Sequence, residues 1–271
     1  MNGASREALA AARERLDALT DSTSVDAAKL ADELAAVTAL LDREVSLRRV
    51  LTDPAQAGEA KADLAQRLLG AQVGGATADL LAGMVRSRWS QSRDLVDALE
   101  ELADTADLTA AQKTGTLDDV EDELFRFGRI VSSSTGLRAA LTDRAATTSA
   151  KSELLRSLLG GRAKVTTERL VTRLVTAPRG RSLESGLESL SKLAAERRER
   201  MVAVVTSAVP LSDVQKRRLG GALAKLYGRT MHLNLGVDPE VVGGIRVQVG
   251  DEVINGSLAD RIEDAGRRLA S

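Results

Sequence analysis

The stretch LRRVLTD at residues 47–53 recurs as LRAALTD at residues 137–143. A shift of 90 residues lays residues 32–70 over residues 122–160 without a gap, and about 15 of the 39 paired positions are identical. Periods of roughly 20 to 50 residues indicate solenoids or propellers, whereas a longer period is typical of a duplicated small domain. The sequence therefore predicts two copies of one small folding unit.

The two copies share the positions of their apolar side chains more than the identity of those side chains. Each copy carries four apolar residues at helical spacing: Leu30, Leu34, Val37 and Leu41 in the first, and Val120, Leu124, Phe127 and Val131 in the second. This spacing is typical of a helix that buries one face. What was duplicated is thus a packing surface, which favours a structural unit over a repeated active site.

Local signals predict four short helices in each copy, after an opening helix at residues 5–18. Ser24 is a candidate N-cap for the helix that carries the first apolar stripe. In both copies the LTD segment ends in an aspartate, Asp53 or Asp143, which is expected to cap the next helix. In the first copy Pro54 suits the first position of that helix, where its missing N–H costs nothing.

The helix after LTD carries Leu64 and Leu68, or Leu154 and Leu158, and is expected to end at a glycine. Gly70 and Gly160 stand at its end, where a left-handed backbone conformation is common. Two further helices are expected, beginning near residues 77 and 92 in the first copy and 167 and 182 in the second. Short helices of this kind are marginal alone in water, so each copy is predicted to be a packed helical bundle.

Composition agrees with a helical protein. Hydrophobic residues make up 43% of the chain but aromatic residues only 1%, so cores must be built from Leu, Val and Ala. Alanine has the highest helix propensity and lets helix backbones approach closely. There is no cysteine, which excludes disulfides, thiol nucleophiles and cysteine-based metal sites.

Charge is distributed unevenly along the chain although the formal net charge is −1. Residues 94–123 hold eleven acidic residues and one basic residue, whereas residues 156–200 hold eleven basic and five acidic residues. We interpret both runs chiefly as solvated helix faces. Nucleic-acid binding is not favoured, because stacking aromatic residues are nearly absent and no known motif accompanies the charge. Whether residues 94–123 form a linker or a helix is left open.

The periodicity changes near residue 201. MVAVVTSAV reads as a buried strand, and Ser212 with Gln215 forms a capping box that opens a helix. Two alternating strands follow, with Gly250 and Asp251 as a hairpin signal and Ser257 as the cap of a last helix. The predicted fold class is mostly α, with two tandem duplicated bundles and a small α+β domain at the C-terminus. The expected divisions are an N-terminal helix at 1–20, bundles at 21–106 and 107–199, and the α+β domain at 200–271.

No catalytic constellation emerges, and no cofactor or metal is predicted. The lone His232 is expected to be a surface strand residue. The acidic run at residues 118–123 is interpreted as the first turn of a helix capped by Thr116, where the helix dipole favours acids. Neither GxxxxGK[ST] nor GxGxxG occurs. Trp89 and Tyr227 are expected to pack at the ends of elements.

One family resemblance is specific. VTSAVPLS at 205–212, followed by VDPEVVGGIRVQVGDEVINGSLADRIEDAGRRL at 237–269, resembles the C-terminal signature of the delta subunit family of F-type ATP synthases. The mitochondrial counterpart is the oligomycin-sensitivity-conferring protein. Family members are usually shorter by about one repeat, so the chain resembles the enlarged actinobacterial form. The signature positions, taken as structural or partner-facing, are Ser207, Ala208, Pro210, Leu211, Ser212, Gly243, Gly244, Ile245, Gly250, Asp251, Gly256 and Ser257.

The resemblance implies a non-catalytic subunit of the peripheral stalk of the synthase. Its partners would be the N-terminal segments of the α subunits and the C-terminal region of the b subunit, with no nucleic acid. It would lie at the cytoplasmic face of the plasma membrane without inserting, since the longest stretch lacking Asp, Glu, Lys and Arg has 12 residues and a spanning helix needs about 20. A free-standing helical adaptor remains the alternative, and a regulatory enzyme or nucleotide binder is a more remote one.

Overall fold

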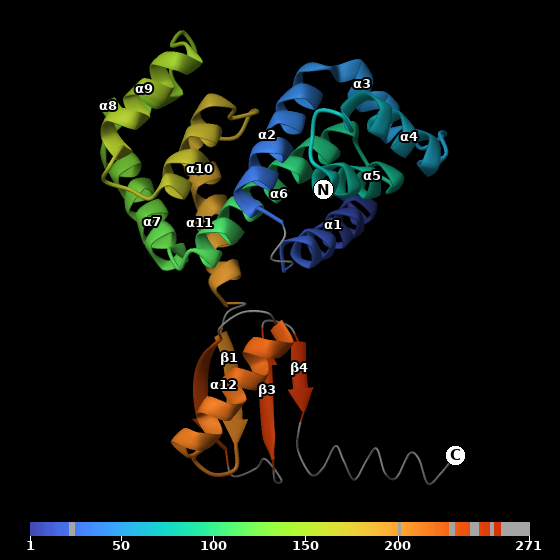
Figure 1. Cartoon of the computed structure of the whole chain (residues 1–271). Helices are drawn as coiled ribbons and strands as arrows, with labels where there is room; N and C mark the ends of the chain where they lie inside the picture. Colours follow the sequence, from blue (N-terminus) through green and yellow to red (C-terminus); the bar gives the residue numbers. More distant parts are fainter. Residues whose placement is uncertain (22–24, 200–201, 228–230, 239–243, 250–251, 256–271) are drawn as a thin grey trace. The chain divides into compact units, whose positions relative to one another are not determined.

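The computed structural model describes residues 1–21, 25–199, 202–227, 231–238, 244–249 and 252–255. The chain divides into two compact units, Met1–Ala194 and Ala195–Ser271. The first unit is helical (Figure 1). Its helices are α1 (Gly3–Asp21), α2 (Ala27–Arg43), α3 (Val45–Thr52), α4 (Gly58–Leu69), α5 (Gly75–Arg86), α6 (Ser92–Lys113), α7 (Leu117–Ser133), α8 (Thr135–Thr142), α9 (Thr148–Leu159), α10 (Val165–Thr176) and α11 (Leu183–Glu199).

The helices recur with the period of the sequence. Helices α2, α3, α4 and α5 have 17, 8, 12 and 12 residues, and α7, α8, α9 and α10 have the same lengths and begin 90 residues later. We call α1–α6 the first bundle and α7–α11 the second bundle. The predicted apolar stripes of α2 and α7 are buried in full, which confirms the packing surface inferred from their spacing.

Helix α6 belongs to both bundles. It packs along α2 and α1 on the side of the first bundle, and it also contacts α7 and α10 of the second (Figure 1). In the first bundle α1 contacts α5. In the second bundle the counterpart of α5 is α10, and the helix that contacts it is α6. The acidic stretch that begins at residue 94 is therefore a helix as far as Lys113, followed by a short turn into α7.

One polar contact is repeated in both bundles. The Glu33 carboxylate on α2 accepts hydrogen bonds from the Gly74 N–H at 2.9 Å and from the Thr77 hydroxyl at the start of α5. Glu123 on α7 accepts the same pair from the Lys164 N–H at 2.9 Å and the Thr167 hydroxyl. The first N–H groups of a helix lack intrahelical partners, so this carboxylate both caps the fourth helix of each repeat, α5 or α10, and holds it to the first, α2 or α7.

The prediction that Asp53 and Asp143 cap the next helix was wrong. Each accepts a hydrogen bond from the backbone N–H two residues on, at 2.9 and 2.8 Å, and closes a turn that contains Pro54 in the first copy. The next helices begin only at Gly58 and Thr148. A break at residues 44 and 134 also divides the region before LTD into two helices, so each copy has one helix more than predicted.

The leucines noted in the sequence are not the most buried side chains of α4 and α9, although Leu64 packs partly buried against the core. In α4 the buried side chains are Lys61, Ala62, Ala65 and Leu69, while Leu68 is 44% exposed; in α9 it is Leu155 that is buried. Gly70 and Gly160 do end these helices, but with φ of −60° and −57° neither is left-handed. At the end of α9 the left-handed residue is the next one, Gly161, with φ of 68°.

Two predicted caps differ as well. The side chain of Thr116 makes no capping hydrogen bond at the start of α7, although Asp118 and Asp119 lie in the first turn as expected. Helix α2 is capped by Asp26, whose carboxylate accepts from the N–H groups of Ala28 and Lys29. The candidate cap Ser24 lies outside the described residues.

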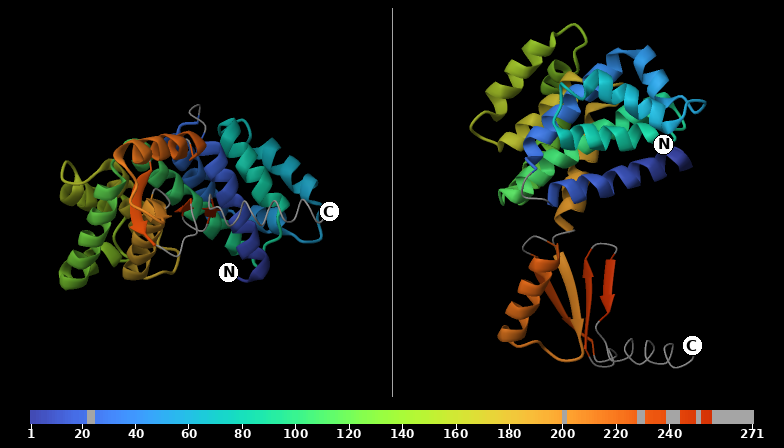
Figure 2. Two further views of the ribbon diagram at one scale, coloured as in Figure 1. Left: turned by 90° about the horizontal axis from the view of Figure 1, so that it is seen from below. Right: turned by 45° about the vertical axis from the view of Figure 1, so that its right-hand side comes forward.

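The second unit contains β1 (Val202–Ser207), α12 (Asp213–Tyr227), β2 (His232–Val237), β3 (Ile245–Val249) and β4 (Glu252–Asn255). The strand order is β2-β1-β3-β4, with β1 and β2 parallel and the other pairs antiparallel. Helix α12 covers one face of the sheet (Figure 2). The core on that face consists of Ala203, Val205, Leu223, Met231, Val247 and Val249.

The capping box that opens α12 is confirmed. The Gln215 N–H donates to the Ser212 hydroxyl oxygen at 3.4 Å, and the Ser212 N–H donates to the Gln215 side chain at 2.9 Å. Val249 pairs with Glu252 across the predicted hairpin. Gly250, Asp251 and the helix predicted from Ser257 lie outside the described residues.

Candidate interface sites

The acidic face of α6 is buried, contrary to the interpretation of the charge run as a solvated face. The side chains of Glu100, Asp104 and Asp107 are only 5%, 10% and 1% exposed. Carboxylates are rarely buried to this degree unless they are paired. Their partners come from the basic run of the second copy, so the two charge runs noted in the sequence meet in the fold.

Two arginines one helical turn apart on α10 hold this face. Arg173 reaches Asp104 and donates to Asp107 at 2.6 Å. Arg169 donates to Asp107 at 2.8 Å and to Asp32 of α2 at 2.6 Å. Planar guanidinium groups suit such paired contacts with carboxylates. Helix α10 is thereby fixed to both α6 and α2 of the first bundle.

The loop after α10 extends the contact. Arg179 and Arg181 both donate to the Glu100 carboxylate, the latter at 2.5 Å. The backbone carbonyl of Arg179 in turn accepts from Arg93. Arg179 has φ of 46°, a conformation uncommon for a residue with a side chain. We call this set of contacts the inter-bundle seam: Asp32, Arg93, Glu100, Asp104, Asp107, Arg169, Arg173, Arg179 and Arg181.

The equivalent contact of the first bundle is more exposed to solvent. Asp79 on α5 occupies the position 90 residues before Arg169, and it pairs with Arg15 of α1 at 2.5 Å. These two side chains are 45% and 50% exposed. The repeated helix pair therefore carries opposite charge in the two bundles, and only in the second are the paired carboxylates buried.

Burial raises the pKa of Asp104 from its ordinary 3.8 to about 7. Arg173 opposes this rise, while the neighbouring carboxylates Glu100 and Asp107 add to it. Between pH 4 and 7, as an approximate window set by these two pKa values, the native protein holds a proton on Asp104 that the unfolded chain has released. This group's contribution to stability is therefore present at low pH and is lost as the pH rises through about 7.

Asp104→Asn is expected to remove that pH dependence, because an amide stays neutral throughout. Compared with the wild type, the variant should gain stability steadily from about pH 4 to about pH 7 and no further above that. The measurement is the difference in urea midpoint between the two proteins at each pH. A difference that does not change with pH, or that shifts in favour of the wild type, would contradict the assignment.

The signature residues that the structure describes lie at one end of the second unit. Ser207 ends β1 and is buried; its hydroxyl donates to the Val209 carbonyl at 2.7 Å, and its own carbonyl accepts from the Asp238 N–H at 3.0 Å. Ala208 and the exposed Pro210 follow in the β1–α12 connection, where Leu211 packs against the sheet core. These contacts hold the β1 end to the residue after β2.

Of the signature glycines Gly243 and Gly244, the structure describes Gly244. Its φ of 95° lies in the region that favours glycine, and it leads directly into Ile245, which packs against the sheet core. Gly243, Gly250, Asp251, Gly256 and Ser257 lie outside the described residues. A partner-facing role for the signature stays a prediction.

The remaining candidates behave as packing or strand residues. Trp89 is 6% exposed and its Nε1 donates to the Met84 carbonyl at 2.8 Å, as expected for an indole packed at a helix end. His232 begins β2. Within the part of the chain that the structure describes, no group of three or more His, Cys, Asp or Glu could hold a metal ion. None of the described helices is long and apolar enough to cross a membrane.

Sequence reasoning missed the inter-bundle seam, although one signal for it was present. The acids at residues 100, 104 and 107 and the arginines at 169 and 173 each repeat at helical spacing, so each set lies on one face. Opposite charge on two such faces allows them to pair. Only the tertiary structure shows that they do.

Comparison with known proteins places the chain. Residues 105–269, more than half of its length, match the family model described as ATP synthase delta (OSCP) subunit. A protein named ATP synthase subunit delta from Streptomyces coelicolor is 85% identical over 271 residues, which cover 100% of this chain and 99% of that one. The protein of the same name from Thermobifida fusca is 48% identical and is covered in full. The chain belongs to the ATP synthase delta (OSCP) family.

Proposed function

We propose that this chain ties the catalytic head of an F-type ATP synthase to its membrane-anchored b subunit. The N-terminal segments of the α subunits bind the helical unit, and the C-terminal region of b binds the C-terminal α+β unit. The chain is thereby held at the cytoplasmic face of the plasma membrane without inserting into it. The observation that carries the proposal is the match to ATP synthase delta subunits along the whole chain.

Membership of the family makes the chain a non-catalytic subunit of the peripheral stalk. The stalk must resist the torque that the rotating central shaft exerts on the head, so its parts must not yield. The inter-bundle seam serves this purpose, because buried pairs such as Arg173 with Asp107 hold the two bundles together. A free-standing adaptor would explain the bundles but not the full-length likeness, so that alternative is not favoured.

The two bundles offer partners different surfaces. The Arg15–Asp79 pair between α1 and α5 of the first bundle is about half exposed, whereas the counterpart of Asp79, Arg169 on α10, pairs with the buried Asp107 of α6 and with Asp32 of α2. A segment that binds this repeated surface can therefore reach it in the first bundle and not in the second. We therefore assign the α segments to the first bundle, while the second bundle extends and braces the stalk. The family match begins at residue 105, inside α6, and continues from the second bundle into the C-terminal unit.

Photo-crosslinking in the assembled synthase tests this assignment. One photoreactive amino acid is placed at Asp79, on the half-exposed α1–α5 surface of the first bundle, and another at Glu153 on α9, an exposed control in the second bundle. The group at Asp79 is expected to crosslink to α several-fold more than the group at Glu153. A photoreactive group at Val253 of β4 is expected to reach b. Crosslinks to α in equal amounts from both bundles, or from neither, would contradict the assignment.

A further inference from the structure

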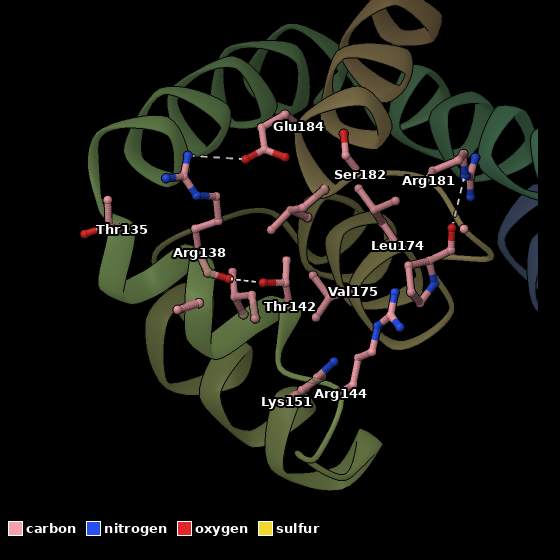
Figure 3. A pocket seen from close by; sticks show the side chains of 15 residues that line it. Thr135, Arg138, Thr142, Arg144, Lys151, Leu174, Val175, Arg181, Ser182 and Glu184 are labelled. Atoms are coloured by element: carbon pink, nitrogen blue, oxygen red, sulfur yellow. Dashed lines mark hydrogen bonds and ion pairs between the residues drawn. The ribbon is translucent and has the colours of Figure 1, made fainter.

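A cavity of about 800 Å³ opens in the second bundle between α8, the start of α9, the end of α10 and the start of α11 (Figure 3). Its size lies in the range of ligand-binding cavities. Buried aliphatic side chains form its wall: Leu141, Leu174, Val175 and Leu183. Four basic side chains surround them: Arg138, Arg144, Lys151 and Arg181. Glu184 is the one acidic residue in the lining.

The first bundle shows what such a space accepts. There Trp89 lines the corresponding corner. It is 6% exposed and donates from Nε1 to the Met84 carbonyl, and the cavity beside it is about 410 Å³. The residue 90 positions later is Arg179, whose guanidinium turns instead to Glu100 of the first bundle. The second bundle thus keeps the aliphatic wall of the corner but lacks the indole, and its cavity is about twice as large.

The acceptor for an indole is kept as well. Leu174 is the counterpart of Met84, and the residue four positions after it is Pro178, which has no N–H to donate to the Leu174 carbonyl. The N–H of Ala177, three positions on, donates to Arg173 instead, at 2.9 Å. Aromatic side chains with a polar N–H pack well where an apolar wall ends in such an acceptor.

The basic side chains around the cavity favour the binding of an anionic group. Arg138 lies 3.5 Å from Glu184 and Arg181 pairs with Glu100. Within the described residues neither Arg144 nor Lys151 has an acidic partner. Lys61, the counterpart of Lys151, is 4% exposed, whereas Lys151 is half-buried at the cavity edge. The second copy therefore presents at Lys151 a cation that the first copy encloses at Lys61, and it adds Arg144 where the first copy has Pro54.

We propose that this cavity is a docking socket for a segment of a partner polypeptide that carries an aromatic side chain beside carboxylates. The aromatic ring takes the place that Trp89 holds in the first bundle, and the carboxylates pair with Arg144 and Lys151. The inference stands on the comparison of the two repeats and is independent of which bundle binds α.

Three short peptides test the chemistry on the full-length protein: acetyl-Glu-Glu-Trp-Glu-Glu-amide, the same peptide with Ala for Trp, and the same peptide with Lys for every Glu. Titrations followed by backbone amide NMR shifts should show saturable binding of the first peptide at residues 139–142 and 180–184. The other two should bind at least tenfold more weakly. Equal binding of the three peptides, or no shift at these residues, would overturn the proposal.

Variants distinguish binding in the cavity from nonspecific attraction between opposite charges. The double variant Arg144→Glu, Lys151→Glu should bind the first peptide at least tenfold more weakly. Ala139 is exposed at the cavity mouth, and Ala139→Trp should abolish binding of the peptide. Arg67→Glu, an exposed charge change in the first bundle, should leave it unchanged. Unaltered binding in the socket variants would overturn the proposal.

A second copy of the chain is the competing occupant, because Phe125 is 58% exposed and follows an acidic run. Sedimentation of the full-length protein decides between the two. We expect a monomer at concentrations where the peptide binds. If the protein forms a dimer and Phe125→Ser dissociates it, the socket binds a second copy, and the proposal is overturned.

Discussion

Replacing Arg173 with alanine is expected to lower the free energy of unfolding of the helical unit by about 3 to 5 kcal/mol, the usual effect of removing one partner from a buried ion pair. Its side chain is 15% exposed, and it faces Asp104 and Asp107, which are 10% and 1% exposed. The substitution leaves these carboxylates without their main counter-charge in a place that is largely shielded from water. Urea unfolding followed by circular dichroism measures the loss.

The first bundle supplies the matched control. Arg15→Ala breaks the equivalent contact with Asp79, but both side chains are about half exposed, so we expect a loss of only about 0 to 1 kcal/mol. Adding Asp104→Ala and Asp107→Ala to Arg173→Ala should recover part of the stability, because the stranded charges are removed with their partner. Equal losses for Arg15→Ala and Arg173→Ala would show that burial of the seam contributes nothing.

Deleting residues 201–271 is expected to abolish ATP-driven proton pumping in membrane vesicles while leaving the two bundles folded. The helical unit has its own core, which runs from α1 to α6, so it should not need the α+β unit to fold. The deletion removes the unit to which we assign the b subunit. Without that attachment the head can turn with the shaft, and ATP hydrolysis is no longer coupled to proton transport.

Two measurements keep this result interpretable. Circular dichroism of the fragment should retain the helical signal and a cooperative thermal transition, which shows that a failure to pump does not come from unfolding. ATP hydrolysis by the head should persist. Proton pumping that survives the deletion would count against the stalk role of the C-terminal unit.

Periodicity predicted the elements of the chain better than single residues predicted their ends. The stripe from Leu30 to Leu41 and its counterpart in α7 are buried as expected, because helical spacing depends only on which residues are apolar. The caps at Asp53 and Asp143 were wrong. A short acidic side chain accepts from a backbone N–H two residues on in a turn as readily as at a helix start, and local sequence does not distinguish the two.

The sequence by itself determined the repeat, the helical and mixed units, and the family, because each of these is written in the order of residue types along the chain. Only the tertiary structure decided that α6 serves both bundles, that its acids are buried against arginines of α10, and that the corner narrowed by Trp89 in one bundle is a larger cavity in the other. The physical reason is that burial, pairing and cavities depend on residues far apart in the chain. Arg173 and Asp107, 66 positions apart, acquire their roles only when α10 packs against α6.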